Sequence, residues 1–176
     1  VEASAKNGLV GTRIYLDFPS VGATENLMIA ACLANGTTTI ENAANEPEII
    51  DLADFLCGMG GSVTGAGSDT IIIKGTTRMH KNNHKIIPDR IEAGTFIICA
   101  AGLGSGIKTE NIEPLHLKPL LAKLTEMGFM FETGLDFIDL KPCQKPKSVD
   151  IKTLPYPGFP TDLQAQTMSL LSTSDG

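Results

Sequence analysis

The chain has 176 residues, of which 42% are hydrophobic and 19% are charged, a balance that excludes a disordered polypeptide and allows a sizeable core. Fourteen basic and twenty acidic residues give a net charge of −6, which argues against a nucleic-acid partner. The longest apolar runs, such as residues 27–34, are too short to span a bilayer, and no signal peptide is visible, so we expect a cytoplasmic protein without a membrane partner.

The first half of the chain alternates strands and helices. Apolar residues at helical spacing and β-branched runs between Gly-rich and Pro-rich turns indicate these elements. Asn45 is predicted to cap the second helix, with Pro47 in its first turn. The expected elements are a strand at 13–16, a helix at 23–34, a strand at 37–40, a helix from 45 to Gly60-Gly61, and strands at 62–64 and 70–74.

The same order then recurs. In the second helix of this pass, leucines and a methionine follow the i, i+3, i+4, i+7, i+10 spacing of one buried helix face; they are Leu117, Leu120, Leu121, Leu124 and Met127. The expected elements are a strand at 85–87, a helix at 91–101, a strand at 107–109, this second helix, and strands at 129–132 and 137–140.

The two passes also match in their letters, which indicates a β-α-β-α-β-β unit repeated about every 70 residues. The matching segments are Met28-Ile29-Ala30-Ala31 with Ile98-Cys99-Ala100-Ala101, Ile40-Glu41-Asn42 with Thr109-Glu110-Asn111, and Met59-Gly60 with Met127-Gly128. A third pass begins with a strand at 149–152 and stops at Gly176, so we interpret the chain as part of a longer protein. Between the first two passes, the polar and basic residues 76–84 predict a solvated linker or loop.

The cysteines predict neither a disulfide scaffold nor a metal site, because they are far apart and have no metal-ligand spacing. Cys32, Cys57 and Cys99 lie in apolar helical runs and are predicted to be buried, whereas Cys143 lies in a polar turn. The three histidines show no metal-ligand spacing either. The sequence contains no phosphate-binding or dinucleotide-binding glycine loop, and we expect no cofactor.

Two turn-to-helix junctions are candidate ligand sites, because a helix N-terminus offers unpaired N–H groups and a positive potential; they are Pro19-Ser20-Val21-Gly22 and Pro160-Thr161-Asp162. At a further junction, Asp89-Arg90, the arginine taken alone is interpreted as a surface or capping-region charge. At Pro160-Thr161-Asp162, Thr161 and Gln164 have the spacing of a capping box. Asp162 then has two interpretations: a carboxylate that complements the helix dipole, or a base placed beside a polar ligand.

Four segments together resemble the enolpyruvyl transferase family, and within it the bacterial UDP-N-acetylglucosamine 1-carboxyvinyltransferases. They are the motifs FPSVGATEN at 18–26, IENAANEPEI at 40–49, PDRIEAGT at 88–95 and FPTDLQAQ at 159–166. This resemblance implies a pair of inverse α/β barrels, each built from three β-α-β-α-β-β units with the helices inside. Residues 1–87 would then end one barrel domain, and residues 88–176 would begin the second half of the other, so that both barrels are incomplete here.

The resemblance implies transfer of the enolpyruvyl group of phosphoenolpyruvate to the 3′-hydroxyl of UDP-N-acetylglucosamine, with release of phosphate, at the start of peptidoglycan synthesis. Asp162 would remove the proton of that hydroxyl. Where many family members carry Lys-Val, this chain has Phe18-Pro19, so backbone and Ser20 contacts would hold the nucleotide. The residues implied to bind the UDP-sugar are Phe18, Pro19, Ser20, Val21, Gly22, Arg90, Thr161 and Asp162.

None of the four cysteines lies in the family's proton-donating cysteine loop, so the resemblance implies that these residues act together with the remainder of the same polypeptide. We expect the 176-residue chain alone to have no turnover. Two alternatives stay open: a 3-phosphoshikimate carboxyvinyltransferase, which shares the fold and the chemistry, and a non-catalytic sugar-nucleotide-binding module of the same fold.

Overall fold

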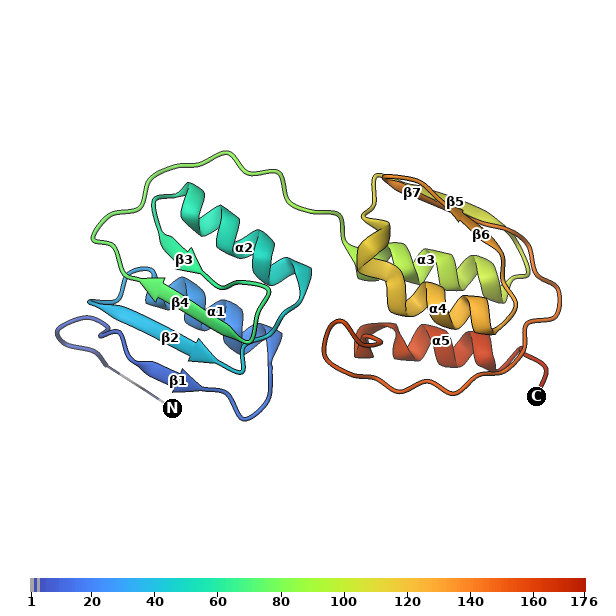
Figure 1. Cartoon of the computed structure of the whole chain (residues 1–176), viewed down its shortest axis with the longest axis horizontal. Coiled ribbons are helices and arrows are strands. Elements are labelled where there is room, and N and C mark those ends of the chain that lie inside the picture. The colour runs from blue at the N-terminus through green and yellow to red at the C-terminus, as the bar shows by residue number, and fades with distance from the viewer. Residues whose placement is uncertain (1, 3) are drawn as a thin grey trace. The chain divides into compact units, whose positions relative to one another are not determined.

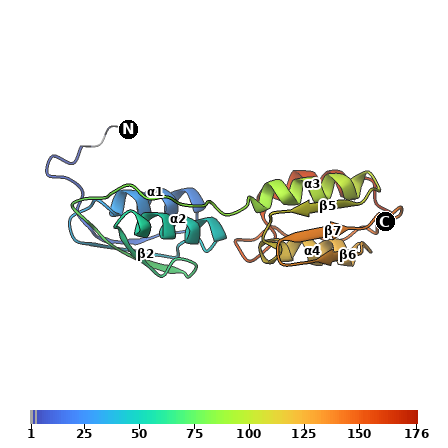
Figure 2. The same ribbon diagram turned by 90° about the horizontal axis from the view of Figure 1, so that it is seen from above.

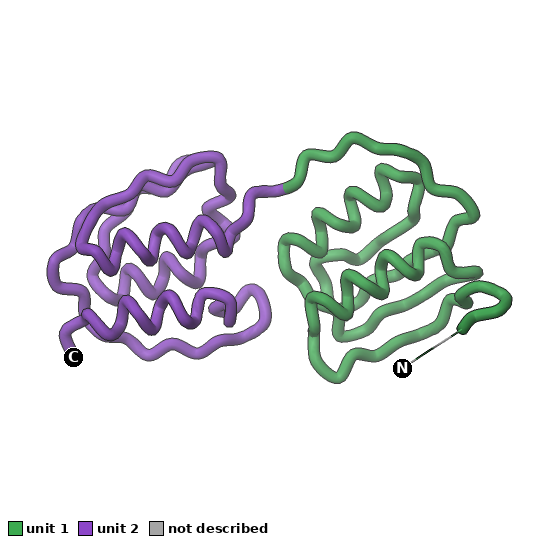
Figure 3. Tube along the Cα trace, turned by 180° about the vertical axis from the view of Figure 1, so that it is seen from behind, with its two compact units in different colours: residues 1–86 green, residues 87–176 purple. Residues whose placement is uncertain are grey.

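The computed structural model describes residue 2 and residues 4–176. The chain folds into two compact units, unit 1 (residues 1–86) and unit 2 (residues 87–176), each with a hydrophobic core of its own (Figure 1, Figure 3). No helix in the described part of the chain is long and apolar enough to cross a membrane.

Unit 1 is one complete β-α-β-α-β-β pass, as the sequence predicts. Its sheet has the order β1-β2-β4-β3, in which β1 runs parallel to β2 and the other pairs are antiparallel. Ile40, Ile71 and Ile73 are fully buried, whereas Ile72 points outward and is 45% exposed. The helices therefore cover one face of the sheet (Figure 2). The elements are β1 (Arg13–Tyr15), α1 (Val21–Ala31), β2 (Thr37–Glu41), α2 (Pro47–Gly58), β3 (Ser62–Thr64) and β4 (Thr70–Lys74).

Unit 2 repeats this arrangement without the first strand and adds a further helix. Its antiparallel sheet has the order β5-β7-β6, which matches β2-β4-β3 of unit 1. The predicted leucine and methionine face of the second helix is buried against Ile138 and Leu140 of this sheet. The elements are α3 (Arg90–Gly102), β5 (Ile107–Glu110), η1 (Pro114–Leu117), α4 (Lys118–Glu126), β6 (Phe131–Thr133), β7 (Phe137–Leu140), η2 (Thr161–Leu163) and α5 (Gln164–Leu171).

The internal repeat is confirmed at the positions where the backbone is most constrained. Asn42 and Asn111 have φ angles of 55° and 56°, and Gly60 and Gly128 have φ angles of 95° and 96°. Asparagine and glycine adopt this left-handed region most readily, which explains why these letters recur. The two side-chain caps, Ser20 of α1 and Asp89 of α3, have the same spacing as the two asparagines. With this spacing Met28 corresponds to Ile97, whereas the match of sequence letters predicted that Met28 corresponds to Ile98.

Two predicted strands are absent from the described structure. Residues 85–87 are irregular, and the side chain of Ile86 is 75% exposed, so the apolar run that suggested a strand buries little surface there. Residues 149–152 are also irregular. On either side of them, isolated parallel bridges join Lys147 to Asp175 and Thr153 to Phe159, but neither bridge continues into a run of paired residues, so no strand forms.

Residues 76–84 are irregular and mostly exposed, as predicted, but they are not a free linker. The Nε2 atom of His84 lies 2.8 Å from Oδ1 of Asp51 on α2, and the His84 ring packs on Phe55 with the ring centroids 5.5 Å apart. Met79 packs against the core of unit 1. These contacts fasten the segment to unit 1.

Two further predictions are wrong in their details. Asn45 does not cap α2, because the helix begins at Pro47 with Glu46 in the cap position, and no side chain accepts a cap hydrogen bond there. Cys32 is buried as predicted, but Cys57 and Cys99 are exposed. Both exposed cysteines lie on helix faces that the core of their own unit does not cover, and an apolar sequence run does not distinguish the faces of a helix.

Asp89 is the stronger of the two side-chain caps, because its Oδ1 atom accepts hydrogen bonds from the backbone N–H groups of Ile91 at 2.8 Å and Glu92 at 3.1 Å. Asp89→Ala is therefore expected to lower the free energy of unfolding by about 1 kcal/mol, measured by urea denaturation. Asp89→Asn, which keeps an acceptor oxygen, should retain most of this stability. An unchanged urea midpoint in the alanine variant would contradict the capping role.

Candidate functional site

The predicted site residues share one position in the repeat, the first turn of the first helix of each pass. Ser20 is the N-cap of α1, Arg90 is the first residue of α3, and Thr161 is the first residue of η2, which continues into α5. Each N-terminus therefore carries the positive end of a helix dipole, and at α1 and α3 the side chains of Ser20 and Asp89 accept hydrogen bonds from N–H groups of the first turn.

The strip Phe18–Gly22 is held by backbone and hydroxyl hydrogen bonds within unit 1. The Ser20 Oγ atom accepts a hydrogen bond from Ala23 N at 3.3 Å, and the hydroxyl of Thr24 donates to Ser20 O at 2.8 Å. The same Thr24 hydroxyl accepts a hydrogen bond from Ala44 N at 3.1 Å. Thr24 is fully buried, so it fixes the strip to the loop before α2.

Within the strip, the side chain of Phe18 is 64% exposed and Val21 packs against the core of unit 1. Pro19 and Ser20 are half-buried, and Gly22 is exposed. A Cβ atom added at Gly22 would meet no atom of the described chain within 4 Å, and the backbone at Gly22 has no positive φ. The fold therefore does not itself require glycine at this position, whereas a ligand lying against the backbone would.

In unit 2, Arg90 lies at the start of α3, beside the cap residue Asp89. Its guanidinium carbon is 5.6 Å from the centroid of the Tyr156 ring, a distance at which a cation is attracted to the face of an aromatic ring. The loop that carries Tyr156 leads into Phe159, which is buried in the core. Arg90 is therefore positioned from two sides, by its own helix and by this loop.

The capping box predicted at Thr161 and Gln164 is not formed. Thr161 is the first residue of a 3-10 turn rather than the residue before it, Pro160 takes the cap position, and neither η2 nor α5 has a side-chain cap hydrogen bond. The carboxylate of Asp162 is exposed and makes no hydrogen bond or ion pair with any other described residue. The structure therefore leaves the Asp162 carboxylate available to a ligand.

Helix packing brings Arg90, Thr161 and Asp162 to one end of unit 2. A Cβ atom at Gly94 would lie 2.8 Å from Leu163, and a Cβ atom at Gly102 would lie 4.0 Å from Leu170. Because both contacts ascend along the chain, α3 and η2–α5 run parallel and their N-termini lie at the same end (Figure 1). Two positive helix ends together favour an anionic ligand. The strip Phe18–Gly22 belongs to unit 1.

Three residues that support these junctions were not singled out from the sequence. Thr24 fixes the Ser20 strip, Tyr156 faces Arg90, and Gln166 donates a hydrogen bond from Nε2 to the Thr95 hydroxyl at 3.0 Å between α5 and α3. The Gln166 Oε1 atom is buried without a partner among the described residues. Thr24 lies in the motif FPSVGATEN and Gln166 lies in the motif FPTDLQAQ. Their closeness in sequence to the predicted site residues is the signal that could have identified them.

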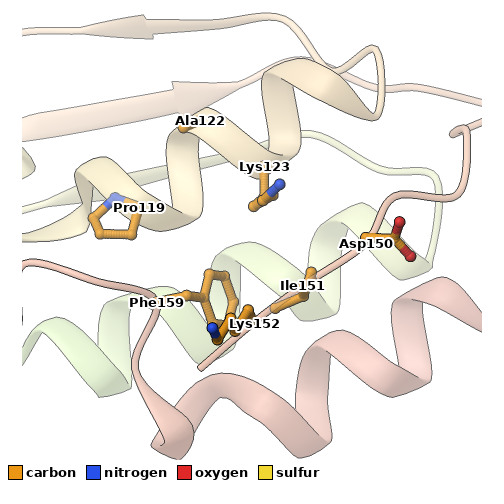
Figure 4. A pocket seen from close by; sticks show the side chains of 7 residues that line it. All are labelled: Pro119, Ala122, Lys123, Asp150, Ile151, Lys152 and Phe159. Carbon is orange, nitrogen blue, oxygen red and sulfur yellow. The ribbon is translucent and has the colours of Figure 1, made fainter. Parts of the chain in front are cut away.

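Two cavities lie away from the predicted site residues. One, of about 580 Å³ in unit 1, is lined by Glu25, Glu48, Asp51 and His84 among others; burial, and then the nearby charge of Glu48, raises the pKa of Glu25. The other, of about 350 Å³ in unit 2, lies between α4 and the extended residues 150–152, beside Phe159 (Figure 4). Among the described residues, no group of three or more His, Cys, Asp or Glu side chains is arranged to hold a metal ion.

Comparison with known sequences finds relatives that carry the same enzyme name. The chain is 53% identical to UDP-N-acetylglucosamine 1-carboxyvinyltransferase 1 of Caldanaerobacter subterraneus subsp. tengcongensis, and 56% identical to UDP-N-acetylglucosamine 1-carboxyvinyltransferase 2 of Clostridium tetani. Both matches cover all of this chain, and the chain spans 42% of the length of each relative.

Solved structures share the fold. The enolpyruvyl transferase NikO from Streptomyces tendae matches with a TM-score of 0.82 and 23% identity, over 97% of this chain and 43% of that one. EPSP synthase from Acinetobacter baumannii matches with a TM-score of 0.57 and 19% identity, over 81% of this chain and 34% of that one. The sequence model of EPSP synthase (3-phosphoshikimate 1-carboxyvinyltransferase) matches residues 1–176. Because this family model matches every residue of the chain, the chain belongs to the EPSP synthase family of enolpyruvyl transferases.

Proposed function

We propose that the protein containing this chain transfers the enolpyruvyl group of phosphoenolpyruvate to the 3′-hydroxyl of UDP-N-acetylglucosamine and releases phosphate. The observation that supports this most is the exposed carboxylate of Asp162, which has no partner among the described residues and lies at the same end of unit 2 as Arg90. The names of the relatives at 53% and 56% identity favour the UDP-sugar as acceptor over shikimate 3-phosphate.

In this proposal each site residue has a role that follows from the chemistry of its side chain or backbone. Asp162 accepts the proton of the 3′-hydroxyl as the hydroxyl oxygen adds to C2 of phosphoenolpyruvate and C3 gains a proton. In the following elimination C3 loses a proton, phosphate leaves C2, and the double bond is restored. A base in this role must lie within hydrogen-bond reach of the hydroxyl, and Thr161 contacts the same sugar. Phe18, Pro19, Ser20, Val21 and Gly22 hold the UDP-sugar through backbone groups and the Ser20 hydroxyl, and Arg90 supplies positive charge.

The same proposal assigns the two units to different domains of the longer protein. Unit 1 forms the end of one inverse α/β barrel domain, and unit 2 begins the second half of the other. Groups outside these 176 residues donate the proton to the enolpyruvyl carbon and hold phosphoenolpyruvate, so the site is completed by the remainder of the same polypeptide.

The substrate assignment is tested by phosphate release from phosphoenolpyruvate by the longer protein that contains this chain. Release is expected with UDP-N-acetylglucosamine as acceptor and not with shikimate 3-phosphate, and the 176-residue chain alone is expected to release none. Release that depends on shikimate 3-phosphate would assign the other transferase. Calorimetric binding of UDP-N-acetylglucosamine without any turnover of the longer protein would instead assign a non-catalytic binding module.

A further inference from the structure

Residues 153–159 form a closed turn that carries Tyr156 at its middle. The backbone N–H of Leu154 donates a hydrogen bond to Phe159 O at 3.0 Å, and an isolated bridge joins Thr153 to Phe159. Phe159 is only 5% exposed and lies in the core of unit 2. The turn is therefore closed on itself and anchored at one end, so Tyr156 is held on a fixed support.

Gly158 shows how tightly this turn is closed. The backbone N–H of Gly158 donates a hydrogen bond to Pro155 O at 2.8 Å. A Cβ atom added at Gly158 would lie 2.5 Å from the Leu154 Cβ atom and 2.9 Å from Pro155 O, which is closer than such atoms can approach. Only glycine allows the two sides of the turn to come this close, and such a tight turn gives the Tyr156 ring little freedom to move.

Arg90 is the residue that this ring faces. Its guanidinium carbon is 5.6 Å from the centroid of the Tyr156 ring. An arginine side chain has many rotamers, and ordering it costs conformational entropy. A guanidinium is attracted to the face of an aromatic ring. The Tyr156 ring therefore favours one direction of the Arg90 side chain.

The place to which Arg90 is directed lies beside the junction that carries Asp162. Arg90, Pro160 and Leu163 line one narrow cleft of unit 2, together with residues of η1 and α4. Pro160 directly precedes Thr161 and Asp162. Since the ring sets the direction of Arg90, it also sets the position of the positive charge relative to the carboxylate of Asp162.

We propose that Tyr156 is a positioning residue: its ring holds the Arg90 guanidinium where the guanidinium meets an oxyanion of a substrate. This inference rests on the proposed function, which gives Arg90 an anionic ligand. The planar guanidinium presents a fork of N–H donors that matches the oxygens of a carboxylate or a phosphate. Both substrates of the proposed reaction carry such groups, namely the diphosphate of UDP-N-acetylglucosamine and the phosphate and carboxylate of phosphoenolpyruvate.

The face of the ring, and not its hydroxyl, makes the contact that positions Arg90. Phenylalanine at position 156 should therefore keep the direction of Arg90, whereas leucine, which is apolar but has no aromatic face, should lose it. Unit 2 offers a comparison, because Lys108 Nζ on β5 lies 4.8 Å from the centroid of the Phe137 ring on β7. This second cation–ring contact involves none of the candidate site residues.

The test measures initial rates of the longer protein with each substrate varied in turn. Tyr156→Leu is expected to raise KM for the substrate that Arg90 contacts by about 2- to 30-fold. It should leave kcat unchanged, because it weakens binding in the ground state and in the transition state alike. Tyr156→Phe should keep the parental KM. The KM that rises identifies the substrate. Phe137→Leu is the matched control: it removes the other cation–ring contact, and neither KM should change.

A double-mutant cycle separates positioning from a general structural role. Because Tyr156 acts through Arg90, Tyr156→Leu should have no further effect on KM in an Arg90→Gln background. The same rise of KM in both backgrounds would overturn the proposal, and so would unchanged KM values for both substrates in Tyr156→Leu.

Nuclear magnetic resonance supplies a measurement that needs neither turnover nor a Tyr156 variant. In the arginine-labelled longer protein, a nuclear Overhauser effect is expected between the Arg90 Nε–H group and the ring protons of Tyr156, and its absence would overturn the proposal. A parental protein that releases no phosphate would instead contradict the proposed function, while the Overhauser effect would still decide whether Tyr156 holds Arg90.

Discussion

Asp162→Ala in the longer protein is expected to lower kcat by about 10²–10⁴-fold, the usual contribution of a positioned base. The free energy of unfolding should stay within about 0.5 kcal/mol of the parent, since an exposed side chain without partners contributes little to stability. Steady-state phosphate release and urea denaturation of the same variant measure the two quantities. Asp162 has no partner among the described residues, so loss of activity would not be a consequence of lost structure.

Asp136→Ala is the matched control for Asp162. Asp136 is also an exposed carboxylate of unit 2, at the turn before β7, and its replacement should leave kcat unchanged. The role of Asp162 as a base would be refuted by unchanged turnover together with a loss of about 1 kcal/mol in stability, because that pattern is the signature of a helix cap.

Gly22→Ala is expected to raise KM for UDP-N-acetylglucosamine by about 10–200-fold, because one misplaced methyl group at a ligand contact costs this much. Stability should be unchanged or slightly higher, since alanine favours a helix over glycine and an added Cβ meets no atom of the described chain within 4 Å. Initial-rate kinetics with varied UDP-N-acetylglucosamine, together with thermal unfolding, measure both effects.

Gly36→Ala serves as the opposite control. An added Cβ at Gly36 also meets no atom within 4 Å, but its φ is +98°, so alanine there is strained whatever the space. This variant should lose about 1 kcal/mol of stability, mainly through backbone strain, and keep the parental KM. If Gly22→Ala also lost stability while KM stayed unchanged, glycine at 22 would serve the fold and not a ligand.

The repeat and most of its elements could be predicted because their signals are local. The alternating Thr37–Glu41 strand and the leucine face of α4 bury the residues that the pattern indicates. Asn42, Gly60, Asn111 and Gly128 recur because the same backbone bend recurs, and few residues adopt positive φ readily.

The remaining predictions failed where the outcome depends on a partner distant in sequence. The run at 149–152 has strand-like letters, but a strand needs a neighbour that accepts and donates its hydrogen bonds, and only isolated bridges, at Lys147 and at Thr153, form on either side of it. The spacing of Thr161 and Gln164 matched a capping box. The helix instead begins with a 3-10 turn at Thr161, which places Pro160 in the cap position, and Pro160 has no side-chain acceptor. The exposure of Cys57 and Cys99 likewise depends on which helix faces the core covers.

The candidate site was likewise predicted in its local features and not in its tertiary arrangement. By itself the sequence determined the repeat, the three helix starts and their motifs, because each depends on neighbouring residues and on the steric limits of φ. Only the tertiary structure decided that Arg90, Thr161 and Asp162 share one end of unit 2, because the packing of Leu163 against Gly94 aligns two helices in parallel. Tertiary structure also decided that the Asp162 carboxylate is exposed and has no partner among the described residues. Whether a side chain has a partner depends on all the residues that surround it in space, and most of these are distant in sequence.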